Sequence, residues 1–101
     1  MVQRPNLLFI LTDQQRRDSM ACYGNRWIQT PNLNRLSEQS FVFENAYVTQ
    51  PVCTPARGSI MTGLYPQTNG LVGNAIPLPK DIDTIAEMVS DDYVCAHLGK
   101  W

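Results

Sequence analysis

A continuous apolar run near the start of the chain constrains its fold more than any other local feature. All five residues between Asn6 and Thr12 are apolar. Such a run predicts a central strand that is buried on both faces, as in parallel sheets. The polar residues 13–18 follow directly, and they would lie at the carboxyl end of this strand, where α/β sheets bind their ligands.

The rest of the chain alternates between helix and strand patterns. Thr30 followed by Pro31 predicts a helix start, because proline suits the first helical position. Gly63 is expected to end a second helix, and Asp83 to cap a third. Strands that alternate with helices indicate an α/β fold. The expected helices cover residues 31–40, 55–62 and 84–90, the expected strands residues 6–12, 41–48 and 93–98, and an extended loop residues 64–81.

Size and charge limit the classes of function. The chain has 101 residues, enough for one small domain, and a formal net charge of −1. This charge provides no basic surface for nucleic acid, and no apolar run approaches the length of a membrane span. The residues given before the first apolar run leave no room for the charged and apolar regions of a secretory signal. We therefore expect a cytoplasmic protein, or a periplasmic or secreted one from which a signal peptide was removed.

The three cysteines do not form a recognisable framework. Cys22, Cys53 and Cys95 are an odd number at wide spacings, which predicts neither a set of disulfides nor a zinc site. Cys22 and Cys95 are expected to be small apolar fillers.

The segment from Cys53 to Gly63 carries the strongest functional signal. A cysteine is followed by Pro55 and then Arg57, and all three lead into the second expected helix. The N–H groups and positive dipole end of that helix predict an anion site beside Cys53, to which Arg57 adds a cation. The alternatives are a buried structural thiol for Cys53 and a solvated helix charge for Arg57.

This segment also resembles a known family. Cys53-Thr54-Pro55-Ala56-Arg57, together with the Thr-Gly-Leu-Tyr-Pro of residues 62–66, resembles the signature of the type I sulfatases, which belong to the alkaline phosphatase superfamily. The resemblance implies the N-terminal part of an alkaline-phosphatase-like sandwich, with a mostly parallel central sheet flanked by helices. It also implies that a maturation enzyme oxidises Cys53 to formylglycine, whose hydrate attacks the sulfur of a sulfate ester.

Two further segments extend the resemblance. Residues 11–14 are similar to a sulfatase strand whose terminal acidic residues hold calcium, which implies Asp13, Gln14 and the oxidised Cys53 as metal ligands. Magnesium or manganese would also suit such oxygen ligands. Many family members have two consecutive aspartates here, so Gln14 departs from the pattern, and an Asp13 that merely caps a turn is the alternative.

The end of the chain carries the other segment. Residues 93–101 resemble the sulfatase strand that ends in Gly-Lys-Trp, which implies that Lys100 reaches the sulfate and the formylglycine. An exposed lysine at the end of the chain is the alternative. His97 is expected to be a structural or partly buried residue rather than a general base, because it lies inside the strand pattern.

The sequence thus predicts a metal-dependent sulfuric ester hydrolase that acts on sulfate esters, with sulfated carbohydrates as the first substrate class. A phosphonate or phosphate monoester hydrolase of the same superfamily, with the same formylglycine, is the alternative. The Asp-Gln form of residues 13–14 resembles both some phosphonate monoester hydrolases and choline sulfatases, so it does not select the substrate. A third hypothesis is an inactive fragment. Sulfatases are several times longer, so we expect residues 1–101 to be an N-terminal fragment of the catalytic domain, with the catalytic histidine and remaining metal ligands beyond residue 101.

Overall fold

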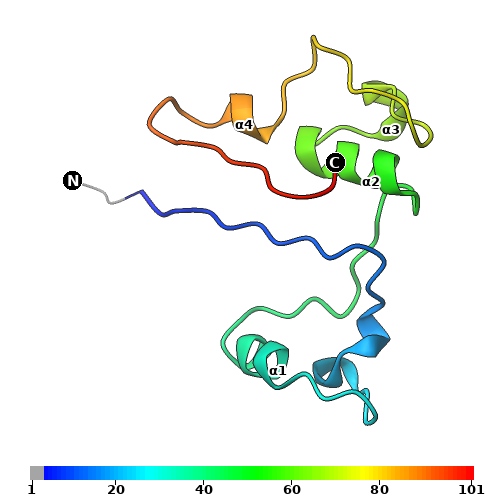
Figure 1. Ribbon diagram of the computed structural model, residues 1–101, viewed down its shortest axis with the longest axis vertical. Helices are drawn as coiled ribbons and strands as arrows, with labels where there is room; N and C mark the ends of the chain where they lie inside the picture. The colour runs from blue at the N-terminus through cyan, green and yellow to red at the C-terminus, as the bar shows by residue number, and fades with distance from the viewer. Residues whose placement is uncertain (1–3) are drawn as a thin grey trace. The chain divides into compact units, whose positions relative to one another are not determined.

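The computed structural model describes residues 4–101 (Figure 1). The chain divides into two compact units between Glu44 and Asn45. Each unit is described by itself. None of the helices in the described part of the chain is long and apolar enough to cross a membrane.

The first unit contains an extended N-terminal run and three short helices. These are the 3-10 helices η1 (Arg17–Ser19) and η2 (Ala21–Tyr23) and the α-helix α1 (Pro31–Glu38). Thr30 precedes α1 and Pro31 is its first residue, as predicted, although the helix ends two residues earlier than expected. The Thr30 hydroxyl accepts the Ala21 N–H at 3.0 Å and so ties α1 to η2.

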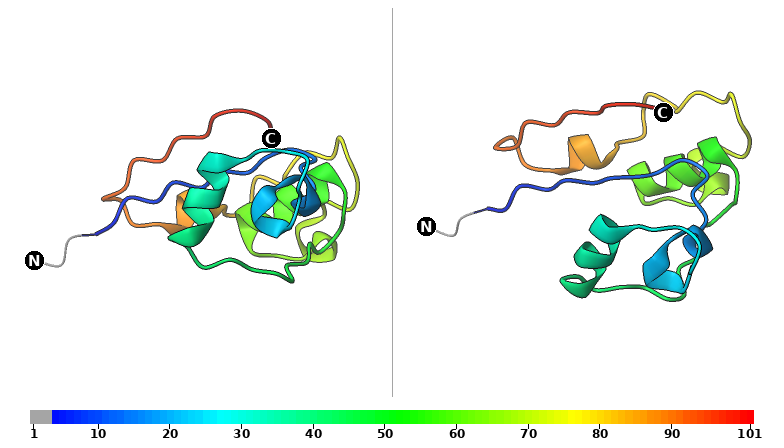
Figure 2. Two further views of the ribbon diagram at one scale, coloured as in Figure 1. Left: turned by 90° about the horizontal axis from the view of Figure 1, so that it is seen from below. Right: turned by 60° about the horizontal axis from the view of Figure 1, so that its bottom comes forward.

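The second unit contains α2 (Cys53–Thr62), α3 (Pro66–Asn69) and α4 (Ile85–Met88). α2 begins two residues earlier than predicted, and Gly63 ends it in the left-handed conformation with φ 70°. Both views in Figure 2 place α3 beside α2, within the segment predicted to be a loop. α4 is shorter than predicted, and its cap is Thr84 rather than Asp83.

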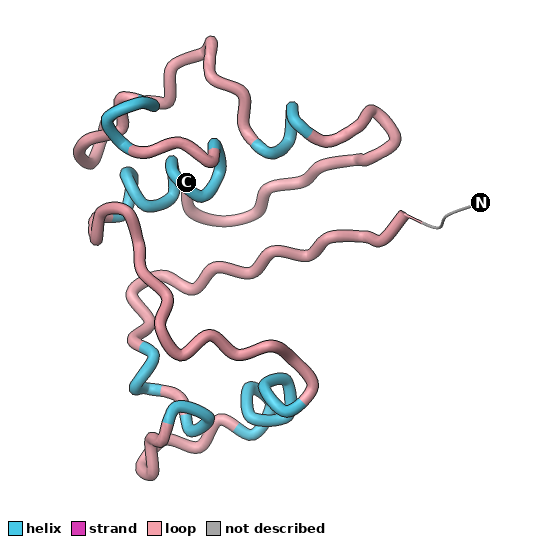
Figure 3. The backbone as a smooth tube through the Cα atoms, turned by 180° about the vertical axis from the view of Figure 1, so that it is seen from behind, coloured by secondary structure: helices cyan, strands magenta, loops and turns pink. Residues whose placement is uncertain are grey.

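The predicted α/β fold is wrong for this structure. Residues 4–101 contain helices and loops but no strand, so neither a parallel central sheet nor the implied sandwich is present (Figure 3). The three segments predicted as strands do not pair with one another, and a strand needs a neighbour to accept its ladder of hydrogen bonds. Their apolar side chains stay exposed: Leu8 is 82 % and Val94 100 % exposed. An apolar run indicates that a segment is suited to burial. It does not identify the neighbouring strand that would pair with the segment and cover it.

The best-packed region joins α2 to the chain that follows it. Leu71 is fully buried and lies directly over Gly58, where an added Cβ would come within 2.2 Å of the Leu71 Cδ1. Asn69 is also fully buried; its Oδ1 accepts the Leu71 N–H at 2.9 Å, and its Nδ2 donates to the Thr62 hydroxyl at 3.3 Å. The polar groups inside this cluster are therefore satisfied by one another.

The Gly58–Leu71 contact makes a stability prediction. We expect Gly58→Ala to lower the free energy of unfolding by about 1 kcal/mol, because overpacking against a buried leucine outweighs the gain in helix propensity. Gly73→Ala is the matched control, since the nearest atom to its added Cβ would be 3.8 Å away. Urea unfolding followed by circular dichroism measures both, and an equal loss in the two variants would contradict the prediction.

The cap of α4 makes a prediction about pH. The N–H and hydroxyl of Thr84 both donate to the Glu87 carboxylate, and the hydroxyl accepts the Ala86 N–H in return. The hydrogen bonds from the Thr84 side chain and backbone hold the pKa of Glu87 below its ordinary value of 4.5. A carboxylate whose pKa is lowered by folding stabilises the folded state above the unfolded pKa, and this contribution is lost as pH falls through the folded pKa.

We therefore expect Thr84→Ala to raise the pKa of Glu87 back toward its ordinary value, as measured by a pH titration of the Glu87 carboxyl ¹³C shift. In Glu87→Gln, the helical signal of α4 should no longer change with acid. A Glu87 titration curve that is identical in wild type and Thr84→Ala would refute the role of the cap.

Candidate active site

Cys53 is the first residue of α2 and is partly buried. The sequence predicted that this helix begins at Pro55, two residues after Cys53. Val52 precedes it in an extended conformation and provides no side-chain cap, whereas Pro55, two residues on, is buried in the first turn. Residue 53 is therefore held at the positive end of a ten-residue helix.

Most of the N–H groups in this first turn are already used. The Ala56 N–H donates to the Val52 carbonyl at 3.0 Å, and Pro55 has no N–H. The Thr54 N–H donates to the side-chain Oδ1 of Asn74 at 3.1 Å. Among residues 4–101, none accepts the N–H of Cys53. The anion site predicted at this helix start thus offers one backbone donor rather than several.

One of the two cations predicted for the site, Lys100, lies next to Cys53, and the other, Arg57, is tied to Lys100. The Lys100 Nζ is 3.9 Å from the Cys53 Sγ, although 47 residues separate them in the sequence. The Arg57 guanidinium donates to the Lys100 carbonyl oxygen at 3.1 Å and so fastens the end of the chain to α2. Figure 1 shows this last segment returning to α2. The structure therefore brings Cys53, Arg57 and Lys100 together.

This cluster has the charge needed to hold an oxyanion. The ammonium of Lys100 carries a positive charge 3.9 Å from the Cys53 Sγ, at the positive end of the helix. Arg57 adds a second cation in the next turn of α2 and is tied to Lys100. A tetrahedral anion beside Cys53 could accept hydrogen bonds from the Lys100 ammonium and from the Cys53 N–H. Cys53 itself would lie beside the central atom of that anion.

The predicted metal ligands belong to the first unit. Asp13 follows the extended apolar run, and Gln14 adopts a left-handed backbone with φ 44°, an uncommon conformation for a residue other than glycine. Carboxylate and amide oxygens suit a hard divalent cation. Within the described residues, no group of three or more His, Cys, Asp or Glu side chains could hold a metal ion. Asp13 and Gln14 are therefore suitable donors but do not form a complete coordination shell by themselves.

The remaining candidates lie on the surface. Cys95 and His97 are exposed, so the expected filler role of Cys95 and the expected partial burial of His97 are both wrong. Cys22 is partly buried. Both residues lie in the segment 93–98, which has the composition of a buried strand but does not pair with another strand among the described residues.

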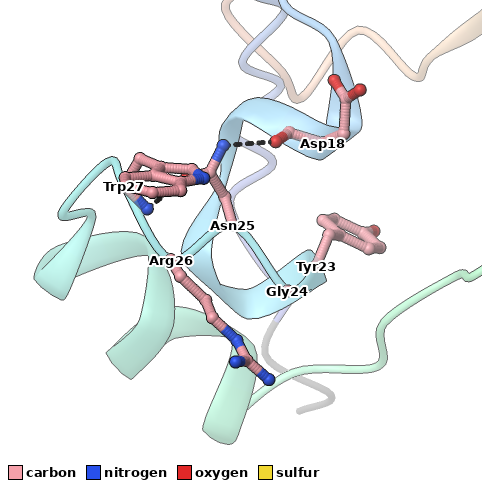
Figure 4. Close-up of a pocket in the computed structure, with 6 residues that line it drawn as sticks. All are labelled: Asp18, Tyr23, Gly24, Asn25, Arg26 and Trp27. Carbon is pink, nitrogen blue, oxygen red and sulfur yellow. Dashed lines mark hydrogen bonds between the residues drawn. The ribbon is translucent and has the colours of Figure 1, made fainter.

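The first unit also has an open hollow in its surface, lined by Asp18, Tyr23, Gly24, Asn25, Arg26 and Trp27 (Figure 4). Asn25 organises it: its Oδ1 accepts the N–H groups of Trp27 and Ile28, both at 2.8 Å, and its Nδ2 donates to the Asp18 carbonyl at 2.7 Å. Arg16 pairs with Asp18, and the hydrogen bond lowers the pKa of the Asp18 carboxyl. The hydrogen bonds of the Asn25 side chain all go to nearby backbone groups, so its role is to stabilise the turn.

Asn74 is the site residue that the sequence did not reveal. It lies in the loop that follows α3. Its side-chain Oδ1 accepts the N–H of Thr54, which is 20 residues earlier in the sequence. No local spacing connects the two positions, and the turn-like composition of residues 64–81 suggested only a loop.

Comparison with known proteins identifies relatives across nearly the whole chain. The Sulfatase family model matches residues 5–101. The "Uncharacterized sulfatase YidJ" of Escherichia coli (strain K12) is 36% identical over 99% of this chain, and the "N-acetylglucosamine-6-O-sulfatase" of Bacteroides thetaiotaomicron is 35% identical over 98%. The human "Steryl-sulfatase" is 33% identical over 97%. No solved structure gives a significant match.

These alignments cover only part of each relative. They take in 20%, 18% and 19% of the three proteins, respectively. The chain thus spans about a fifth of the length of the curated relatives that it matches.

Proposed function

The chain belongs to the sulfatase family, and on that premise we propose that it is the N-terminal segment of a longer catalytic domain that hydrolyses sulfate esters. The observation that carries the proposal is the approach of Lys100 to Cys53 at the start of α2. A lysine 47 residues away meets the cysteine at a helix N-terminus, and Arg57 fastens it there. A structural cysteine needs no such pair of cations.

In this proposal Cys53 is the precursor of formylglycine, formed by a maturation enzyme. Formylglycine, once hydrated, supplies the hydroxyl that attacks the sulfur. The first turn of α2 holds residue 53 in place, and Lys100 and Arg57 neutralise the charge on the sulfuryl oxygens. Donors fixed in advance where negative charge develops are usually the largest single contribution to catalysis. Arg57 also orients Lys100 through the Lys100 carbonyl.

We propose that Asp13, Gln14 and the modified residue 53 bind a divalent cation, with calcium as the first candidate and magnesium or manganese as the others. The support is the oxygen-only donor set of Asp13 and Gln14, which suits hard cations. A cation bound there would polarise the sulfate group and supply positive charge in addition to that of Lys100 and Arg57.

For the substrate we propose a sulfated carbohydrate. Several of the relatives are named for a carbohydrate substrate. They include the N-acetylglucosamine-6-O-sulfatase and an "Ulvan-active sulfatase" of Formosa agariphila, the latter 39% identical over 97% of this chain. The family match favours sulfate esters over the phosphonate and phosphate alternative. A panel of sulfate, phosphonate and phosphate monoesters with full-length protein tests this preference, and faster turnover of the phosphorus esters would reverse it.

The modification of Cys53 makes the first prediction about the site. Coexpression of the full-length protein with a formylglycine-generating enzyme should lower its intact mass by about 18 Da, because CH₂–SH becomes CHO. Cys53→Ala is the control and should show no such change. An unmodified Cys53 in an active wild-type protein would exclude the formylglycine mechanism.

The two cations make the second prediction about the site. Lys100→Met removes the ammonium but keeps the length of the side chain, so we expect kcat/KM for a sulfate ester to fall about 100-fold, in the range measured for single transition-state donors. Lys80→Met changes an exposed lysine of the same unit and should stay within about twofold of wild type. A similar loss of kcat/KM in both variants would mean that catalysis depends on the net charge of the protein and not on the position of Lys100.

A further inference from the structure

We infer that Asn74 is a positioning residue for residue 53, an inference that rests on the proposed sulfatase function. The side-chain Oδ1 of Asn74 accepts the N–H of Thr54, the residue next to Cys53, at 3.1 Å. Asn74 acts in this role through the backbone of α2 and not through the substrate.

Few other hydrogen bonds hold the first turn of α2 in place. Val52 provides no side-chain hydrogen bond to the helix, and Pro55 has no N–H to donate. The unsatisfied N–H groups of a helix start are normally capped by a local side chain. Here the cap comes from a residue 20 positions away. The position of residues 53 and 54 therefore depends on the loop that carries Asn74.

That loop is anchored by two contacts just ahead of Asn74. Leu71 is buried against Gly58 of α2, and the Gln50 Nε2 donates to the Val72 carbonyl at 3.0 Å. Ala75, directly after Asn74, has a left-handed backbone with φ 60°. A residue with a Cβ keeps this conformation only where its surroundings determine it. Asn74 is thus presented to α2 by a fixed loop.

The cap has a specific consequence for the site. Because Asn74 takes the Thr54 N–H, the N–H of Cys53 is the first-turn donor that remains for an anion. The cap also keeps residue 53 in helical geometry, and the Cys53 side chain lies 3.9 Å from the Lys100 ammonium. Loss of the cap would let the first turn fray and move residue 53 relative to Lys100.

Three variants of the full-length protein separate this role from general loop anchoring. Asn74→Ala removes the acceptor, whereas Asn74→Asp keeps an oxygen in its place. Gln50→Ala removes the other tether of the same loop without touching the first turn of α2. The unmodified protein, selectively labelled with ¹³C-cysteine and ¹⁵N-threonine, reports the helical Cα shift of Cys53 and the amide exchange of Thr54 without any need for activity.

We expect Asn74→Ala to move the Cys53 Cα shift toward its random-coil value and to speed Thr54 exchange about fivefold, as for the loss of one exposed hydrogen bond. Asn74→Asp should restore both signals, and Gln50→Ala should leave them unchanged. A Cys53 shift that is the same in Asn74→Ala as in wild type would overturn the inference. So would an equal shift in Gln50→Ala, because the loop tether alone would then explain it.

The matured protein provides the kinetic test. Asn74→Ala should lower kcat for a sulfate ester about fivefold with little change in KM, and Asn74→Asp should recover most of kcat. A rise in KM alone would overturn the positioning role and indicate a substrate contact. If wild-type protein bearing formylglycine hydrolyses no sulfate ester, the proposed function fails, and the nuclear magnetic resonance signals still decide whether Asn74 fixes residue 53.

Discussion

Leu71 packs into the space that Gly58 leaves on α2, and the candidate site depends on this contact. A side chain at residue 58 would occupy the volume of the Leu71 Cδ1. With glycine there, the chain after α3 can lie directly against α2, and the buried Asn69 secures it through the Leu71 N–H. The same stretch of chain then presents Asn74 to the start of α2. One missing Cβ in the helix thus permits the close approach through which a distant loop caps the residue beside Cys53.

The positive charge beside Cys53 has a direct chemical meaning. A helix start favours negative groups, and the Lys100 ammonium lies 3.9 Å from the Cys53 Sγ at the start of α2. Arg57 holds the end of the chain there through the Lys100 carbonyl. An anion beside Cys53 would interact favourably with the ammonium and with the helix start, which is the physical reason to interpret the cluster as a place for a sulfate group.

The sequence predicted features that depend on neighbouring residues and missed those that depend on distant ones. Pro31 and Gly63 mark helix ends through their own backbone restrictions, so α1 and the end of α2 were predictable. α3 carried the same signals, Pro66 at its start and Gly70 after its end, but the turn-rich composition around it concealed them. The strands were wrong because pairing requires a partner that apolar periodicity does not identify. Lys100 was predicted only through the family resemblance, and Asn74 lay outside any motif.

Burial in this structure supports the interpretation of the chain as part of a longer protein. Leu71 is the one fully buried large apolar side chain among the described residues, whereas Leu8 and Ile10 are 82 % and 76 % exposed. Full burial of such a side chain stabilises a protein by about 1.5–3 kcal/mol, so one buried leucine does little against the conformational entropy of 101 residues. The relatives are about five times as long. We therefore expect the cluster around Cys53 to act as a catalytic centre only when further protein covers these apolar side chains.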